Sequence, residues 1–103
     1  MNIEYERLCF ELKENLETQK ALEEDLLRLP KGHVNTLYRN SKGYYYLTYR
    51  DGKKVKNDYL GPVGKTDLND VFTKLRLRER YRKELKILKE EETELRKKIR
   101  DAE

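Results

Sequence analysis

Apolar residues recur at steps of three and four over residues 1–30, the spacing that one face of an amphipathic helix requires. Pro30 ends the pattern, because proline lacks an N–H group and clashes with the preceding helical turn. We therefore predict a helix over residues 1–29. Its stripe consists of Tyr5, Leu8, Leu12, Leu22, Leu26 and Leu29, with polar Asn15 and Gln19 at its centre.

The same spacing returns after Thr66 and Asp67, either of which suits the cap position before a helix. It continues to Ala102, so a long second helix is predicted over residues 66–102. Two such stripes pair as an antiparallel coiled-coil hairpin. The second stripe consists of Leu68, Val71, Leu75, Tyr81, Leu85, Leu88, Glu92, Leu95, Ile99 and Ala102.

Three runs rich in Tyr, Val, Thr and Leu lie between the helices, at residues 34–40, 44–50 and 53–60. Asp51-Gly52 is a strong hairpin signal, and the segment from Asn40 to Gly43 also favours a turn. Residues 33–60 are therefore predicted to form a three-stranded antiparallel β-meander. The predicted fold is α+β, a single domain over residues 1–103 with the meander inserted between the two long helices.

Turn length decides which side chains share a face of the meander. A two-residue turn at Asp51-Gly52 pairs Thr48 with Val55, and a three-residue turn with a left-handed Gly43 pairs Tyr38 with Tyr46. One face then gathers Val34, Thr36, Tyr38, Tyr44, Tyr46, Thr48, Val55 and Tyr59. The other gathers Leu37, Arg39, Tyr45, Leu47, Tyr49, Lys54 and Lys56. We expect the first face to be buried, because burying lysines is costly.

Composition and charge exclude several classes of function. The chain is 43% charged with a net charge of +4, and the eight Lys/Arg and two Asp of residues 31–65 give this segment alone +6. Cys9 and His33, each the only residue of its kind, make no disulfide scaffold, zinc site or catalytic set. We expect no enzyme activity, cofactor or metal. No apolar run is long enough to cross a membrane, so a cytoplasmic protein is expected.

Basic and aromatic side chains occur together in the meander and at the start of the second helix. Phosphates favour such a surface, and exposed tyrosine rings stack on bases or pack on sugars. The alternative is that the basic residues only solubilise the sheet and pair with glutamates. The candidate nucleic-acid contacts are Arg39, Tyr45, Tyr49, Arg50, Lys53, Lys54 and Lys56 in the meander and Arg76, Arg80 and Lys83 on the helix.

The helices also permit a role in assembly. Asn15, Gln19 and Glu92 interrupt the stripes, and polar interruptions of this kind specify a register or a partner at a cost in stability. A homodimer through the helical arm, or a larger protein partner, would cover the remaining apolar positions. Packing within one chain is the simpler alternative. The remaining positions are Cys9, Leu16 and Ile87.

The central segment resembles a known family. The matching residues are Leu29-Pro30-Lys31-Gly32, the run from Gly43 through Tyr44-Tyr45-Tyr46-Leu47 to Lys56, and Tyr59-Leu60-Gly61. This pattern resembles small uncharacterised bacterial, archaeal and phage proteins in which coiled-coil helices flank such a hairpin. It is more loosely similar to a tyrosine-rich hairpin near the N-terminus of some transposases. The resemblance implies a phage or mobile-element context and favours nucleic-acid binding, and no catalytic residue of transposases has a counterpart here.

The sequence therefore predicts a small protein that binds the phosphate backbone of DNA or RNA through a Tyr/Lys-rich sheet. The alternative from a different class is a protein-interaction module that inhibits a nucleic-acid-dependent machine of the host, as anti-CRISPR proteins do. The net charge of +4 argues against simple DNA mimicry, which needs an acidic surface.

Overall fold

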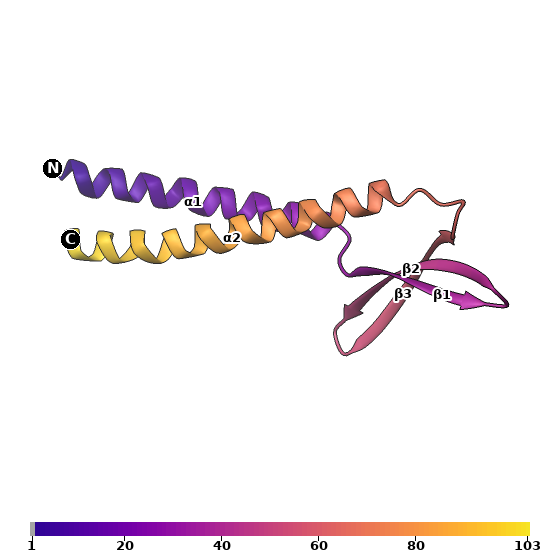
Figure 1. Cartoon of the computed structure of the whole chain (residues 1–103). Coiled ribbons are helices and arrows are strands. Elements are labelled where there is room, and N and C mark those ends of the chain that lie inside the picture. The colour runs from indigo at the N-terminus through magenta and orange to yellow at the C-terminus, as the bar shows by residue number, and fades with distance from the viewer. Residues whose placement is uncertain (1) are drawn as a thin grey trace. The chain divides into compact units, whose positions relative to one another are not determined.

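The computed structural model describes residues 2–103 and has two helices with a three-stranded antiparallel sheet between them (Figure 1). This arrangement confirms the predicted α+β class. Asp67 precedes the second helix, and its carboxylate accepts a hydrogen bond of 2.8 Å from the Asn69 N–H group. In chain order the elements are α1 (Ile3–Arg28), β1 (His33–Arg39), β2 (Lys42–Asp51), β3 (Lys54–Pro62) and α2 (Asn69–Ala102).

Contacts within the chain divide it into two compact units. The first, here called the helical unit, comprises residues 1–28 and 79–103. The second, here called the sheet unit, comprises residues 29–78 and so includes the first turns of α2. Over residues 2–103, neither helix is long and apolar enough to span a membrane.

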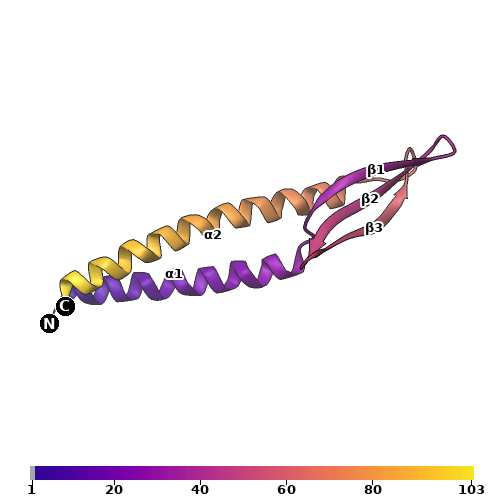
Figure 2. The ribbon, with the colours of Figure 1, turned by 90° about the horizontal axis from the view of Figure 1, so that it is seen from below.

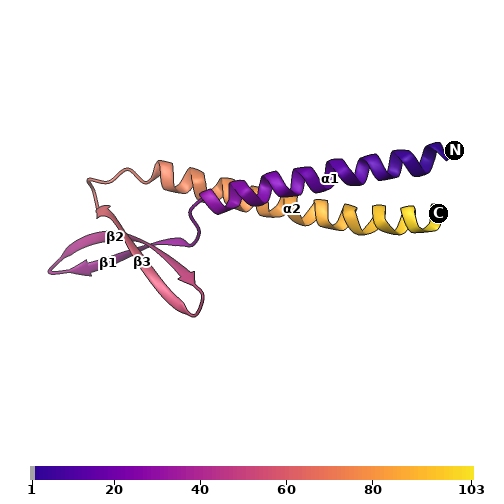
Figure 3. The same ribbon diagram turned by 180° about the vertical axis from the view of Figure 1, so that it is seen from behind.

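In the helical unit, α1 runs antiparallel to the distal part of α2, and the two chain ends lie close together (Figures 1 and 3). Asn2 donates a side-chain hydrogen bond of 3.4 Å to the Ala102 carbonyl at that end. Leu8 and Leu22 of the predicted stripe are buried. Buried apolar side chains at heptad spacing hold such a hairpin together, as the sequence pattern predicts.

A layer of polar side chains crosses the middle of this apolar seam. Asn15 and Gln19 are 6% and 7% exposed. The Asn15 amide donates to the Leu88 carbonyl at 2.9 Å, and Gln19 Nε2 donates to Asn15 Oδ1 at 2.7 Å and to Glu92 Oε1 at 2.8 Å. Arg96 Nε donates to Glu92 Oε2 at 2.7 Å. Because these groups meet only in one alignment of the helices, the layer fixes the register of the hairpin.

The sheet unit has the strand order β1-β2-β3, with β2 in the middle (Figure 2). The β1–β2 turn consists of Asn40 and Ser41, whose φ angles are 50° and 64°. Type I′ hairpin turns require positive φ at both central residues, and asparagine tolerates it well. The predicted three-residue turn was therefore wrong. In the structure Leu37 pairs with Tyr44, whereas Tyr38, predicted to pair with Tyr46, pairs with Gly43.

The β2–β3 turn is one residue later than predicted. Gly52 takes its first central position with a φ of 62°, and Thr48 pairs with Asn57 instead of Val55. Type II′ turns place glycine at that position. Further along β3, Tyr46 pairs with Tyr59 but Tyr45 pairs with Gly61, so Leu60 is the extra residue of a β-bulge.

These registers change which face of the sheet is buried. Leu47 is 7% exposed, although it was predicted on the outer face, whereas Val55 and Tyr59 are 58% and 57% exposed although they were predicted to be interior. The prediction failed because a one-residue difference in the first turn moves every side chain of β1 to the other face. Val34, Thr36 and Tyr38 consequently share a face with Leu47, and Leu37 and Arg39 share the opposite one.

Candidate nucleic-acid interface

Two tyrosine rings pack against a third on the face of the sheet opposite Leu47. Tyr44 and Tyr46 come from β2, and Tyr59 lies beside them on β3 because it pairs with Tyr46. The centroid of the Tyr59 ring lies 5.4 Å from that of Tyr46 and 6.3 Å from that of Tyr44, with tilted planes. We call this group the tyrosine cluster. Rings in this arrangement support one another while their outer surfaces stay open to solvent.

Two basic residues adjoin the tyrosine cluster at the end of the β1–β2 hairpin. Arg39 and Lys42 are directly paired across the strands, and both side chains are exposed. Like charges directly opposite each other in a sheet are destabilising. In the part of the chain that the structure describes, no carboxylate lies within ion-pair distance of either one. An anion bound here would relieve their repulsion.

The cluster and the basic pair surround one shallow depression, here called the tyrosine hollow. Its volume is about 470 Å³. The lining residues are Arg39, Asn40, Lys42, Tyr44, Tyr46 and Tyr59. Apolar rings beside unneutralised cations suit a ligand that has both a flat unsaturated group and an anionic group.

A row of hydrogen bonds holds the three strands together next to the tyrosine cluster. The Asn35 amide donates to Thr48 Oγ1 at 2.7 Å, and the Thr48 hydroxyl donates to Asn57 Oδ1 at 2.6 Å. One residue from each strand takes part, so the row fixes the register of the whole sheet. The tyrosine cluster therefore sits on a defined platform instead of a flexible hairpin.

The predicted site residues divide between the two sheet faces. Tyr45 and Tyr49 are half-buried on the face of Leu47, and the register places Lys54 and Lys56 on this same face. Arg50 pairs with Val55 and belongs to the opposite face, while Lys53 lies in the β2–β3 turn. Arg39 was predicted on the same face as Lys54, at its edge, but lies on the face of the tyrosine cluster. The structure therefore does not bring the predicted sheet residues together as one patch.

Lys56 is engaged within the sheet. Its Nζ lies 2.8 Å from an Asp51 carboxylate oxygen. The hydrogen bond and charge of Lys56 lower the pKa of Asp51, and those of Asp51 raise the pKa of Lys56. A phosphate at this lysine would have to compete with that carboxylate. Lys56 is therefore a weaker candidate for a phosphate contact than the unpaired Arg39 and Lys42.

The helical candidates are all exposed but belong to different units. Arg76 lies in the sheet unit, whereas Arg80 and Lys83 lie in the helical unit. Arg80 Nε forms an ion pair with Glu84, one turn further along α2, at 3.4 Å. Exposed pairs of this type contribute little, so Arg80 stays available to other anions.

Of the residues that line the tyrosine hollow, only Arg39 was predicted from the sequence as a nucleic-acid contact. Tyr44, Tyr46 and Tyr59 were predicted to be buried, and Lys42 was predicted as a basic turn residue but not as a nucleic-acid contact. The signal that would have found them is Asn40, because asparagine at a central position favours the two-residue turn that reverses the face of β1. Among residues 2–103, no group of three His, Cys, Asp or Glu side chains is arranged to hold a metal ion.

Part of the chain matches a known protein family. Residues 11–70 match the family model described as Domain of unknown function (DUF6788), a span that includes most of α1, the whole sheet and the start of α2. No curated protein and no solved structure matches the chain.

Proposed function

We propose that this chain, which belongs to the DUF6788 family, binds nucleic acid at the tyrosine hollow. The observation that supports the proposal is the position of Arg39 and Lys42 beside the tyrosine cluster, in which the Tyr59 ring packs against those of Tyr44 and Tyr46. Bases would stack on the rings while phosphates neutralise the two cations. This proposal keeps the sheet as the binding element but uses the face opposite to the one that the sequence predicted.

The exposure of the tyrosine rings favours nucleic acids with unpaired bases as ligands. Tyr59 is 57% exposed, and the rings of Tyr44 and Tyr46 flank it on a three-stranded platform. Stacking on an aromatic side chain requires a base whose face is open, which a duplex interior does not offer. We therefore expect single-stranded DNA or RNA to bind more tightly than a duplex of the same length.

Fluorescence anisotropy of labelled single-stranded DNA, duplex DNA and RNA, each at two salt concentrations, tests the proposal. Tyr59→Leu removes one stacking surface and should weaken single-strand binding about tenfold. The matched control is Tyr38→Leu. Tyr38 is also an exposed tyrosine on an edge strand, 70% exposed, but on the opposite sheet face. This control should change the affinity less than about twofold.

Two outcomes would contradict the proposal. Equal losses for Tyr59→Leu and Tyr38→Leu would mean that the tyrosine hollow has no special part in binding. If none of the three ligands bound even at low salt, the exposed apolar side chains on the same sheet face as the hollow, Leu37, Val55 and Tyr59, would instead favour a protein partner, as the alternative function predicts.

A further inference from the structure

A stripe on α2 has charges of opposite sign at equal distances on either side of one apolar residue. Ile87 is the centre. Lys83 and Arg80 precede it by four and seven residues, and Glu91 and Glu94 follow it by four and seven residues. Steps of three and four keep these side chains on one face of the helix. All five positions belong to the helical unit.

The stripe is exposed and largely unpaired. Ile87 is 55% exposed, so its apolar side chain is accessible to another molecule. Over residues 2–103, no ion pair involves Lys83, Glu91 or Glu94, and Arg80 has only its surface pair with Glu84. These charges are therefore available to another molecule.

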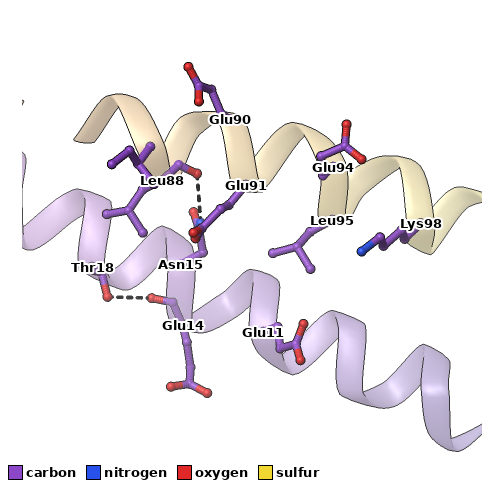
Figure 4. A pocket seen from close by; sticks show the side chains of 11 residues that line it. Glu11, Glu14, Asn15, Thr18, Leu88, Glu90, Glu91, Glu94, Leu95 and Lys98 are labelled. Atoms are coloured by element: carbon purple, nitrogen blue, oxygen red, sulfur yellow. Dashed lines mark hydrogen bonds between the residues drawn. The ribbon is translucent and has the colours of Figure 1, made fainter. Parts of the chain in front are cut away.

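The acidic half of the stripe borders a hollow between α1 and α2 (Figure 4). The hollow has a volume of about 630 Å³. Leu88 and Leu95 contribute apolar side chains to its lining, and Glu11 and Glu14 of α1 also line it. Five glutamates and a single lysine line it, so their mutual repulsion favours a cationic occupant. The glutamates are Glu11, Glu14, Glu90, Glu91 and Glu94, and the lysine is Lys98.

We propose that the occupant is a second copy of this chain, with the two α2 helices antiparallel about a two-fold axis at Ile87. In that arrangement Lys83 of each copy meets Glu91 of the other, and Arg80 meets Glu94. The two Ile87 side chains meet on the axis. The methylene stems of Arg80 and Lys83 cover the apolar part of the hollow while their charged ends meet its glutamates.

The charge pattern itself favours a second copy over an unrelated partner. Two-fold association requires that a surface be complementary to itself. A stripe with two cations on one side of its centre and two anions at the same distances on the other meets this requirement when it is reversed. The inference does not depend on nucleic-acid binding at the tyrosine hollow, because it involves only residues of the helical unit.

Sedimentation equilibrium of the full chain over a concentration series tests the proposal. The wild-type chain should dimerise, with weaker association at high salt. Arg80→Glu/Lys83→Glu and Glu91→Lys/Glu94→Lys should each weaken homodimerisation at least about 100-fold, because four attractive pairs become repulsive. An equimolar mixture of the two variants should form a heterodimer at wild-type strength, since every pair in it is again attractive. Circular dichroism verifies that each variant retains its helices.

A cross-link locates the axis. In a Cys9→Ser background, Ile87→Cys should form a disulfide-linked dimer under mild oxidation, because the two positions meet on the axis. The matched control is Thr93→Cys, which is exposed on α2 but away from the stripe, and it should remain uncross-linked. A wild-type chain that stays monomeric throughout the series would overturn the proposal. So would a dimer that the charge variants leave unchanged, or equal cross-linking at both positions.

Discussion

Gln19 of α1 donates a hydrogen bond to Glu92 of α2, with 2.8 Å between Nε2 and Oε1. The same amide nitrogen also donates to Asn15 Oδ1 at 2.7 Å, so one buried side chain joins both helices of the hairpin. A fully paired polar layer of this kind gives up some apolar burial in exchange for a single alignment. The alignment matters here because it determines which side chains lie along each edge of the hairpin.

The polar layer should make the stability of the helical unit sensitive to acid. Hydrogen bonds from Gln19 and then Arg96 lower the pKa of Glu92 below its usual 4.5. A carboxyl group with a lowered pKa in the folded state stabilises the fold above its unfolded pKa, and this contribution disappears as the pH falls through the folded value. We therefore expect the free energy of unfolding to decrease more between pH 6 and pH 3 in the wild type than in Glu92→Gln.

Urea denaturation followed by circular dichroism at several pH values measures this difference. Glu24→Gln serves as the control, because Glu24 is an exposed glutamate of α1 outside the polar layer. The control should retain the acid sensitivity of the wild type. If Glu92→Gln retained it to the same degree, the contacts of Glu92 would not contribute to pH-dependent stability.

The buried face of the sheet yields a second prediction. Leu47→Ala should destabilise the sheet unit by about 2–4 kcal/mol, because it leaves a cavity at a position that is 7% exposed. Leu37→Ala, at a position that is 50% exposed on the opposite face, should cost less than about 1 kcal/mol. Chemical denaturation monitored by tyrosine fluorescence compares the two. The reverse ranking would support the face that the sequence predicted to be buried.

Leu47 also shows why the sequence predicted the fold better than the site. The periodicity that predicts a helix depends on many residues, so an error at one position does not change the predicted helix. The two sheet faces depend on one turn, where the choice between Asn40-Ser41 and a loop ending at Gly43 decides the face of all of β1. The cost of burying Lys54 and Lys56 was also a poor guide. Both belong to the edge strand β3, where long side chains reach solvent even from the face that buries Leu47.

Gly32 connects α1 to the sheet in a conformation that other residues rarely adopt. Its φ is 107°, and a Cβ atom there would overlap the backbone carbonyl of Thr48. Gly32→Ala should therefore destabilise the sheet unit by more than about 2 kcal/mol. Gly52→Ala is the matched control, because Gly52 also has a positive φ but open space around it, and it should cost only about 1 kcal/mol. Thermal unfolding of both variants measures the difference, and equal losses would mean that the Thr48 carbonyl moves aside readily.

Removing the charges of Arg39 and Lys42 should lower the affinity for nucleic acid without lowering the stability of the fold. Arg39→Gln/Lys42→Gln should weaken single-strand binding about tenfold and reduce the slope of log affinity against log salt by about 1.4, because two phosphate contacts are lost and each contributes about 0.7 on a single strand. The same change should leave the fold as stable or raise its stability by up to about 1 kcal/mol, because two like charges no longer face each other. A variant that is at least as stable and yet binds less tightly cannot owe its loss of affinity to unfolding.

Lys53→Gln/Lys54→Gln is the control. It removes the same net charge at the opposite end of β2 and should reduce affinity only slightly. If that control caused the larger loss, the phosphates would lie along Lys53 and Lys54, two of the five phosphate contacts that the sequence alone predicts in the sheet, and not at the tyrosine hollow.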